Sequence, residues 1–182
     1  MKILAINSNG GPDYLADLIL SQIIYDQKHD IFTNHLPAYL FDDWGNAFKL
    51  YGRGYTVFTK IEKSYKQNIN ILDENILLKK LHNHEFDLII YTSIWRNHLS
   101  IMDAISIYEK NRIIVIDGED HTNVLNIAPK VKYYKRELTE LFSNICLPIS
   151  FSFPSFYKPK INIIEKKKTL LAPCIQIGRA HV

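Results

Sequence analysis

The chain has 182 residues and a formal net charge of +3 at neutral pH, with 47% hydrophobic and 23% charged residues. These proportions are typical of one globular domain and exclude a chain that is mainly disordered or of low complexity. The longest basic run is three lysines at 166–168, and the longest apolar stretch, 86–94, is interrupted by Asp87. The sequence therefore indicates neither a nucleic-acid-binding surface nor a membrane span, which needs ~20 apolar residues.

The first predicted element is a buried strand at residues 2–7, which runs into the glycine-containing loop 8–12. Asp13 is suited to cap the helix that follows, because apolar residues recur at helical spacing from residue 15 to about residue 26. The chain therefore opens as a strand, a glycine loop and a helix.

The next segment, residues 29–70, gives a weak signal. Within it, a β-prone run at 55–59 predicts an inserted strand or hairpin around residues 45–62. A helix is predicted to open at Asp73 and Glu74 and to lead toward His84.

Two more buried strands are predicted, at residues 87–91 and 112–117, with a helix at about 99–109 between them. Strands that alternate with helices are typical of α/β proteins. We therefore predict a Rossmann-like, open, mostly parallel sheet with helices on both faces. The strands at 2–7, 87–91 and 112–117 are expected to be neighbours in it.

The predicted domain covers residues 1–168, and residues 169–176 are expected to begin a linker or a second domain. The last six residues depart from the bias of the whole chain, which contains 27 isoleucines and only 8 alanines. They can be encoded by ATC GGA AGA GCA CAC GTC, which coincides with the start of a widely used sequencing adapter. We therefore expect residues 177–182 to be a non-native tail on the N-terminal part of a longer protein.

The chain contains two cysteines, Cys146 and Cys174, and Met1 leads into the first strand without a signal-peptide cleavage site. We therefore expect a reducing, cytoplasmic location. His82 and His84 are expected at the surface, and no zinc-ligand spacing can be assembled from these residues. No metal or other cofactor is predicted.

Open α/β sheets bind ligands outside the carboxyl ends of their strands, and this rule selects the loops 8–13, 92–98 and 117–122. In the first loop, Asn9, Gly10 and Gly11 precede a helix N-terminus, which favours a phosphate or sugar oxygen. The loop lacks the Gly-x-Gly-x-x-Gly spacing of dinucleotide-binding proteins. The structural alternative is a tight turn that lets the helix pack close to the sheet.

The third loop presents four side chains suited to catalysis or binding: Asp117, Glu119, Asp120 and His121. Carboxylates and an imidazole can act as acid or base, bind sugar hydroxyls or hold a divalent cation. The alternative is an ion-paired turn or a helix cap, with Lys135 or Arg136 as the partner.

Arg96 is the one fixed cation in the three loops. It can pair with an anionic substrate or with the group around Asp117, and an internal Arg–Asp bridge is the alternative. We expect Arg96, the acidic loop, Lys135 and Arg136 to converge at the carboxyl edge of the sheet, facing the first loop.

Four segments in the chain carry a family resemblance: residues 86–96 (FDLIIYTSIWR), 116–121 (IDGEDH), 133–138 (YYKREL) and 147–154 (LPISFSFP). In this order they resemble the N-terminal half of bacterial glycosyltransferase-like proteins of the spore-maturation (CgeB-like) type. The resemblance covers roughly residues 1–165, and the last two segments are its more specific part.

The resemblance implies one half of a GT-B architecture, in which two Rossmann-like halves enclose a cleft and the C-terminal half holds most of the nucleotide-sugar donor. This chain would be the acceptor-side half, inactive by itself, in the synthesis of bacterial cell-surface material or polysaccharide. Asp120 or His121 would be the base that deprotonates a carbohydrate or other acceptor. The substrate-binding residues would be Asn9, Gly10, Gly11, Arg96, Asp117, Glu119, Lys135 and Arg136.

Two other classes share the strand pattern. A signalling receiver domain needs an acidic phosphoacceptor, and the segment around Tyr91 and Thr92 has none. A non-catalytic Rossmann-like domain that binds a ligand or acts as a scaffold stays open as the alternative.

Overall fold

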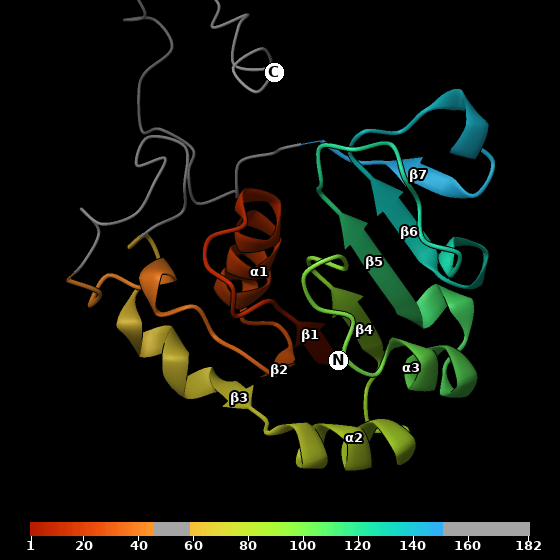
Figure 1. Ribbon diagram of the computed structural model, residues 1–182. Coiled ribbons are helices and arrows are strands. Elements are labelled where there is room, and N and C mark those ends of the chain that lie inside the picture. Colours follow the sequence, from red (N-terminus) through yellow and green to blue (C-terminus); the bar gives the residue numbers. More distant parts are fainter. Residues whose placement is uncertain (46–58, 151–182) are drawn as a thin grey trace, which may run out of the picture.

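The computed structural model describes residues 1–45 and 59–150 (Figure 1). In these ranges the chain forms an open seven-stranded sheet in the order β3-β2-β1-β4-β5-β6-β7, and every neighbouring pair is parallel. The strands are β1 (Lys2–Ile6), β2 (Asp30–Thr33), β3 (Ile69–Ile71), β4 (Leu88–Tyr91), β5 (Ile113–Asp117), β6 (Lys132–Lys135) and β7 (Cys146–Pro148). The order reverses between β1 and β4, as in doubly wound nucleotide-binding folds. The predicted Rossmann-like α/β fold is thus confirmed.

The three strands predicted from sequence are adjacent in the centre of the sheet. Ile3 of β1 pairs with Leu88 of β4, and Ile89 of β4 pairs with Ile113 of β5. Successive side chains of a strand point to opposite faces, so a strand that is covered on both sides must be apolar throughout. The unbroken apolar runs in the sequence are the consequence of this double cover.

The helices lie on both faces of the sheet, as predicted. They are α1 (Tyr14–Asp26), α2 (Glu74–His82) and α3 (Ile101–Ile107). Ile3 of β1 packs in the cluster of α1 with Leu15, whereas the next residue, Leu4, packs in the cluster of α2 and α3 with Leu77 and Ala104. Figure 1 shows α1 apart from α2 and α3, which lie together.

Two helices begin at the aspartates that the sequence singled out. The carboxylate of Asp13 accepts a hydrogen bond from the Ala16 amide, and that of Asp73 accepts one from the Ile76 amide. The third helix is shorter than the predicted range 99–109. Its preceding residue, Ser100, has a left-handed φ of 57° and makes no side-chain cap, and the chain becomes extended at Tyr108.

Strands β2, β3 and β7 were not predicted. They have only three or four residues each, and β3 and β7 expose side chains such as Ile71 and Leu147, so no apolar run marks them. Most of the hairpin predicted around 45–62 lies outside the described residues, as do the segments 169–176 and 177–182. None of the helices in the described ranges is long and apolar enough to cross a membrane.

Candidate functional site

The ends of β1, β2 and β4 are tied together by the side chain of Asn7, which is buried at the point where the strand order reverses. Its Nδ2 donates to Thr33 Oγ1 at 2.7 Å, and its Oδ1 accepts from Thr92 Oγ1 at 2.7 Å. Asn97 Nδ2 donates to the Asn7 carbonyl at 2.6 Å. Because these buried groups satisfy one another, the carboxyl edge of the sheet has a fixed shape.

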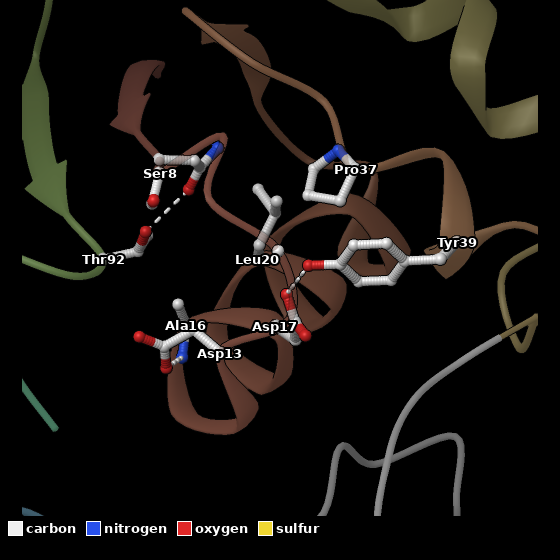
Figure 2. A pocket seen from close by; sticks show the side chains of 10 residues that line it. Ser8, Asp13, Ala16, Asp17, Leu20, Pro37, Tyr39 and Thr92 are labelled. Atoms are coloured by element: carbon white, nitrogen blue, oxygen red, sulfur yellow. Dashed lines mark hydrogen bonds between the residues drawn. The ribbon is translucent and has the colours of Figure 1, made fainter. Parts of the chain in front are cut away.

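Two hollows flank the loop between β1 and α1. The smaller one lies between that loop, α1 and the segment around Pro37 (Figure 2). Asp17 faces it from the first turns of α1, and Tyr39 donates its hydroxyl to Asp17 Oδ1 at 3.0 Å. Asp17 Oδ2 has no hydrogen-bond partner within residues 1–45 and 59–150.

Burial raises the pKa of Asp17 to about 7, and the nearby charge of Asp13 adds to the rise, while the hydrogen bond from Tyr39 opposes it. Burial also raises the pKa of the Tyr39 hydroxyl, and the charge of Asp17 adds to that rise. Asp17 is a titratable group that the sequence analysis missed. Its helical spacing from Leu20 and Ile24, three and seven residues further on, puts Asp17 on a buried face of α1 and was the available signal.

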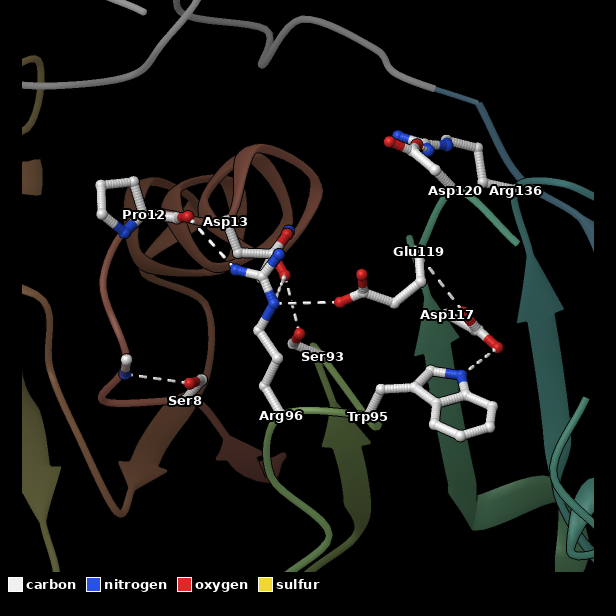
Figure 3. A network of polar contacts seen from close by, with 12 residues as sticks. Ser8, Pro12, Asp13, Ser93, Trp95, Arg96, Asp117, Glu119, Asp120 and Arg136 are labelled. Carbon is white, nitrogen blue, oxygen red and sulfur yellow. Dashed lines mark hydrogen bonds and ion pairs between the residues drawn. The ribbon is translucent and has the colours of Figure 1, made fainter. Parts of the chain in front are cut away.

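The larger hollow, which we name the arginine cleft, opens to solvent (Figure 3). It lies between the start of α1 and the loops that follow β4, β5 and β6, at the predicted carboxyl edge. Its lining residues are Pro12, Asp13, Tyr14, Leu15, Arg96, Gly118, Glu119, Asp120 and Arg136.

Arg96 crosses the cleft toward the loop after β5. Its Nε donates to Glu119 Oε1 at 3.0 Å and lies 3.6 Å from Asp13 Oδ2, and its Nη1 donates to the Pro12 carbonyl at 3.3 Å. Partial burial alone would lower the pKa of Arg96, but Asp13 and Glu119 together raise it above its usual value. Arg96 is therefore a permanent positive charge at the mouth of the cleft.

Arg136 supplies the second positive charge, from the residue that follows β6. Its guanidinium pairs with the carboxylate of Asp120, and its Nε lies 3.2 Å from Glu137 Oε1. The side chain of Arg136 is 17% exposed, whereas that of Asp120 is 91% exposed. A largely buried cation thus meets a carboxylate that projects into solvent.

Asp117 and Lys135 are fully buried and lie beneath the cleft instead of lining it. Lys135 Nζ and Asp117 Oδ1 are 2.8 Å apart. Asp117 Oδ2 accepts from Trp95 Nε1 at 2.7 Å and from the Tyr133 hydroxyl at 2.6 Å. Burial, then the hydrogen bond to Asp117, raises the pKa of Tyr133. The sequence analysis named the partners of this ion pair but missed the contributions of Trp95 and Tyr133.

The remaining predicted site residues lie around the rim. His121 packs its ring edge-on against Trp95 with centroids 4.7 Å apart, and its buried Nδ1 has no hydrogen-bond partner in the described part of the chain. Asn9 and Gly10 are exposed, and Gly11 has a φ of 103°, which favours glycine. Gly11 borders the smaller hollow and not the arginine cleft.

The described residues contain no group of three histidine, cysteine, aspartate or glutamate side chains that could hold a metal ion. Comparisons of the chain with protein-family models, with curated proteins and with solved structures found no match. The fold and the site together define this protein as a Rossmann-like α/β domain with a charged cleft at its topological switch point.

The raised pKa of Asp17 predicts a pH-dependent stability. Between pH 3.8, the ordinary pKa of an aspartate, and about pH 7, the pKa of Asp17 in the folded state, the folded state keeps a proton that the unfolded state has released. The free energy of unfolding therefore falls as the pH rises through this range. Asp17→Asn should abolish this slope and stabilise the protein at pH 8 by on the order of 4 kcal/mol relative to wild type. Urea unfolding at pH 5 and pH 8 measures it, with the partly exposed Asp26→Asn on the same helix as control. Equal slopes in wild type and Asp17→Asn would contradict the assignment.

The buried ion pair predicts strong coupling between Asp117 and Lys135. Lys135→Met should lower the free energy of unfolding by about 3–5 kcal/mol, because it leaves a buried carboxylate unpaired. The double variant Asp117→Asn/Lys135→Met should recover much of the loss, since no buried charge remains. Lys132→Met, on the exposed side of the same strand, is the control and should have little effect. Additive losses in the double variant, measured by urea unfolding, would show that the pair is not coupled.

Proposed function

We propose that this chain is the N-terminal, acceptor-side half of a glycosyltransferase with two Rossmann-like halves, which transfers a sugar from a nucleotide-sugar donor. The observation that carries the proposal is the position of the arginine cleft, at the edge where Rossmann-like sheets bind their ligands. Three of the segments that resemble the spore-maturation type, 86–96, 116–121 and 133–138, contribute five of the nine residues that line this cleft.

In this proposal Arg96 and Arg136 bind the anionic part of a substrate, and Glu119 binds sugar hydroxyls. Asn9, Gly10 and Gly11 contact the substrate from the rim. Asp117 and Lys135, which the resemblance implies as substrate-binding residues, are fully buried and act by positioning. The three buried contacts of Asp117 hold the loops that carry the two arginines.

The proposed reaction joins an acceptor hydroxyl to the anomeric carbon of the donor sugar. Asp120 or His121 takes the hydroxyl proton while the bond from the anomeric carbon to the diphosphate breaks, and the electron pair leaves with the nucleoside diphosphate. Cationic side chains stabilise the charge that develops on this leaving group. The donor would be held mainly by the second half, and the reaction would take place in the cytoplasm during the synthesis of bacterial cell-surface material or polysaccharide.

A second candidate function is a non-catalytic binding or scaffold domain. The observation that favours it is the pairing of each carboxylate of the acidic loop with a cation of the same chain. Asp117 pairs with Lys135, Glu119 with Arg96, and Asp120 with Arg136. An ion-paired turn of this kind needs no ligand to be stable.

The two candidates differ in what substitutions at the rim do. In a protein that contains both halves, Asp120→Asn and His121→Ala should each lower kcat, and the substitution that removes the base should lower it by ~100-fold or more, the usual contribution of a general base. The free energy of unfolding should change by no more than ~1 kcal/mol, since Asp120 is exposed and His121 is only partly buried. Asp43→Asn, an exposed carboxylate paired with Lys66, is the control and should alter neither quantity. If both rim variants lose stability and keep their specific activity, the loop is a structural turn.

The proposed division of labour also predicts the behaviour of the 182-residue chain by itself. Donor turnover needs groups from both walls of the cleft, so the chain should release no nucleoside diphosphate from a panel of nucleotide sugars. A coupled assay for nucleoside diphosphate measures this. Turnover near ~1 s⁻¹, an ordinary enzyme rate, would contradict the requirement for a second half.

A further inference from the structure

The arginine cleft contains more negative than positive side chains. Two guanidinium groups, of Arg96 and Arg136, face the three carboxylates of Asp13, Glu119 and Asp120. A site with this balance repels the anionic ligands for which paired arginines are suited. The three carboxylates, however, are not held equally firmly.

Asp13 belongs to the frame of the cleft. Its Oδ1 accepts from the Ala16 amide at 3.1 Å as the cap of α1, and its Oδ2 accepts from Ser93 Oγ at 2.7 Å. Its side chain is 14% exposed. A ligand that displaced this carboxylate would break the helix cap and a hydrogen bond to the loop after β4.

Glu119 and Asp120 are held by single arginines. Glu119 Oε1 accepts from Arg96 Nε at 3.0 Å with its side chain 28% exposed, and the exposed carboxylate of Asp120 pairs with Arg136. Ion pairs that water can reach contribute little to stability. Either carboxylate can therefore turn into solvent with little loss, provided that the backbone allows it.

The backbone at Glu119 is anchored beneath the cleft. The Glu119 amide donates to Asp117 Oδ1 at 3.3 Å, and Lys135 Nζ donates to the Glu119 carbonyl at 3.4 Å. At Gly118, an added Cβ would lie 3.2 Å from Leu15 Cδ2, so the loop passes close to α1. Rotation of the two side chains, without movement of the loop, is enough to withdraw their carboxylates from the guanidinium groups. Arg96 then keeps its contacts with Asp13 and Pro12, and Arg136 keeps its contact with Glu137.

We propose that the carboxylates of Glu119 and Asp120 act as an internal anion that occupies the arginine cleft, and that a phosphate- or diphosphate-bearing ligand binds by displacing them. Guanidinium groups that pair with carboxylates also match phosphate oxygens in geometry. The phosphate oxygens of such a ligand can therefore take the place of the carboxylate oxygens at the same N–H donors. Because of the internal anion, a ligand must carry enough negative charge of its own to bind in the cleft. Neutral sugars do not displace it, whereas a ligand with several phosphate charges does.

The internal anion rests on the proposed function, because the same cleft receives the substrate. To that function it adds phosphate groups as the chemical class of the ligand and a means of regulating its binding. It concerns binding alone, so it is tested without a donor, an acceptor or a second half. If the double variant described below shows no gain in pyrophosphate affinity, the proposal of an internal anion is wrong, and the proposed function is still decided by the transfer assays. Conversely, a chain without transfer activity can still show the displacement.

The test is the affinity of the 182-residue chain for pyrophosphate, measured by isothermal titration calorimetry at low ionic strength. Glu119→Gln/Asp120→Asn should bind pyrophosphate at least about tenfold more tightly than wild type, because two repelling charges close to the anion are removed. Adding Arg96→Gln to this double variant should abolish the gain. Inorganic phosphate, with fewer charges, should show the same order with a smaller difference.

The matched control is Asp43→Asn/Glu85→Gln, which removes two carboxylates that pair with Lys66 and Lys80 away from the cleft. It changes the net charge equally and should leave pyrophosphate affinity near that of wild type. An equal gain in the control, no gain in the cleft variant, or a gain that survives Arg96→Gln would each overturn the proposal. If the double variant does not fold, Asp120→Asn alone, at a side chain that is 91% exposed, should give part of the gain, and no gain there overturns it.

Discussion

The arrangement of the candidate site depends on one buried ion pair. Asp117 and Lys135 are both fully buried at the ends of the neighbouring strands β5 and β6, and Lys135 Nζ lies 2.8 Å from Asp117 Oδ1. Removing two charges from water costs more than their attraction returns, unless further hydrogen bonds satisfy the remaining oxygen. Trp95 and Tyr133 supply those hydrogen bonds to Asp117 Oδ2. The carboxylate therefore fixes the loops after β4 and β5 and the end of β6 with respect to one another.

The same ion pair explains why charged residues gather above it. Each of its anchors is next in the chain, or next but one, to a residue of the arginine cleft: Trp95 to Arg96, Asp117 to Glu119, and Lys135 to Arg136. At the end of a strand, neighbouring residues point in opposite directions. Lys135, the last residue of β6, thus points into the protein, and its neighbour Arg136 points into the cleft. The loops after β4 and β5 bring Arg96 and Glu119 to the same cleft (Figure 3). The buried network and the exposed charges are two faces of one arrangement.

Features that depend on residues close together in the sequence could be predicted, whereas features that depend on contacts between distant segments could not. The central strands were predictable because double cover requires an apolar run, and the caps at Asp13 and Asp73 because capping is local. Strands β2, β3 and β7 were not, since a strand of three or four residues is defined by its neighbours in the sheet. For the site, topology was enough to bring Arg96, the acidic loop and Arg136 to one edge. The burial of Asp117 and Lys135 could not be predicted from the sequence. It depends on hydrogen bonds that Asp117 of β5 accepts from Trp95, in the loop after β4, and from Tyr133 of β6.

The hollows on either side of the β1–α1 loop follow opposite electrostatic rules. At Asp17 an acid is withdrawn from water beside a tyrosine, so burial dominates and favours the neutral form. In the arginine cleft the carboxylates of Glu119 and Asp120 remain in contact with solvent, and each is paired with a guanidinium group. A buried neutral acid changes with pH but has no counterion to exchange. Exposed ion pairs can exchange a carboxylate for another anion at little cost, and this is why ligand chemistry is to be sought in the cleft and pH dependence at Asp17.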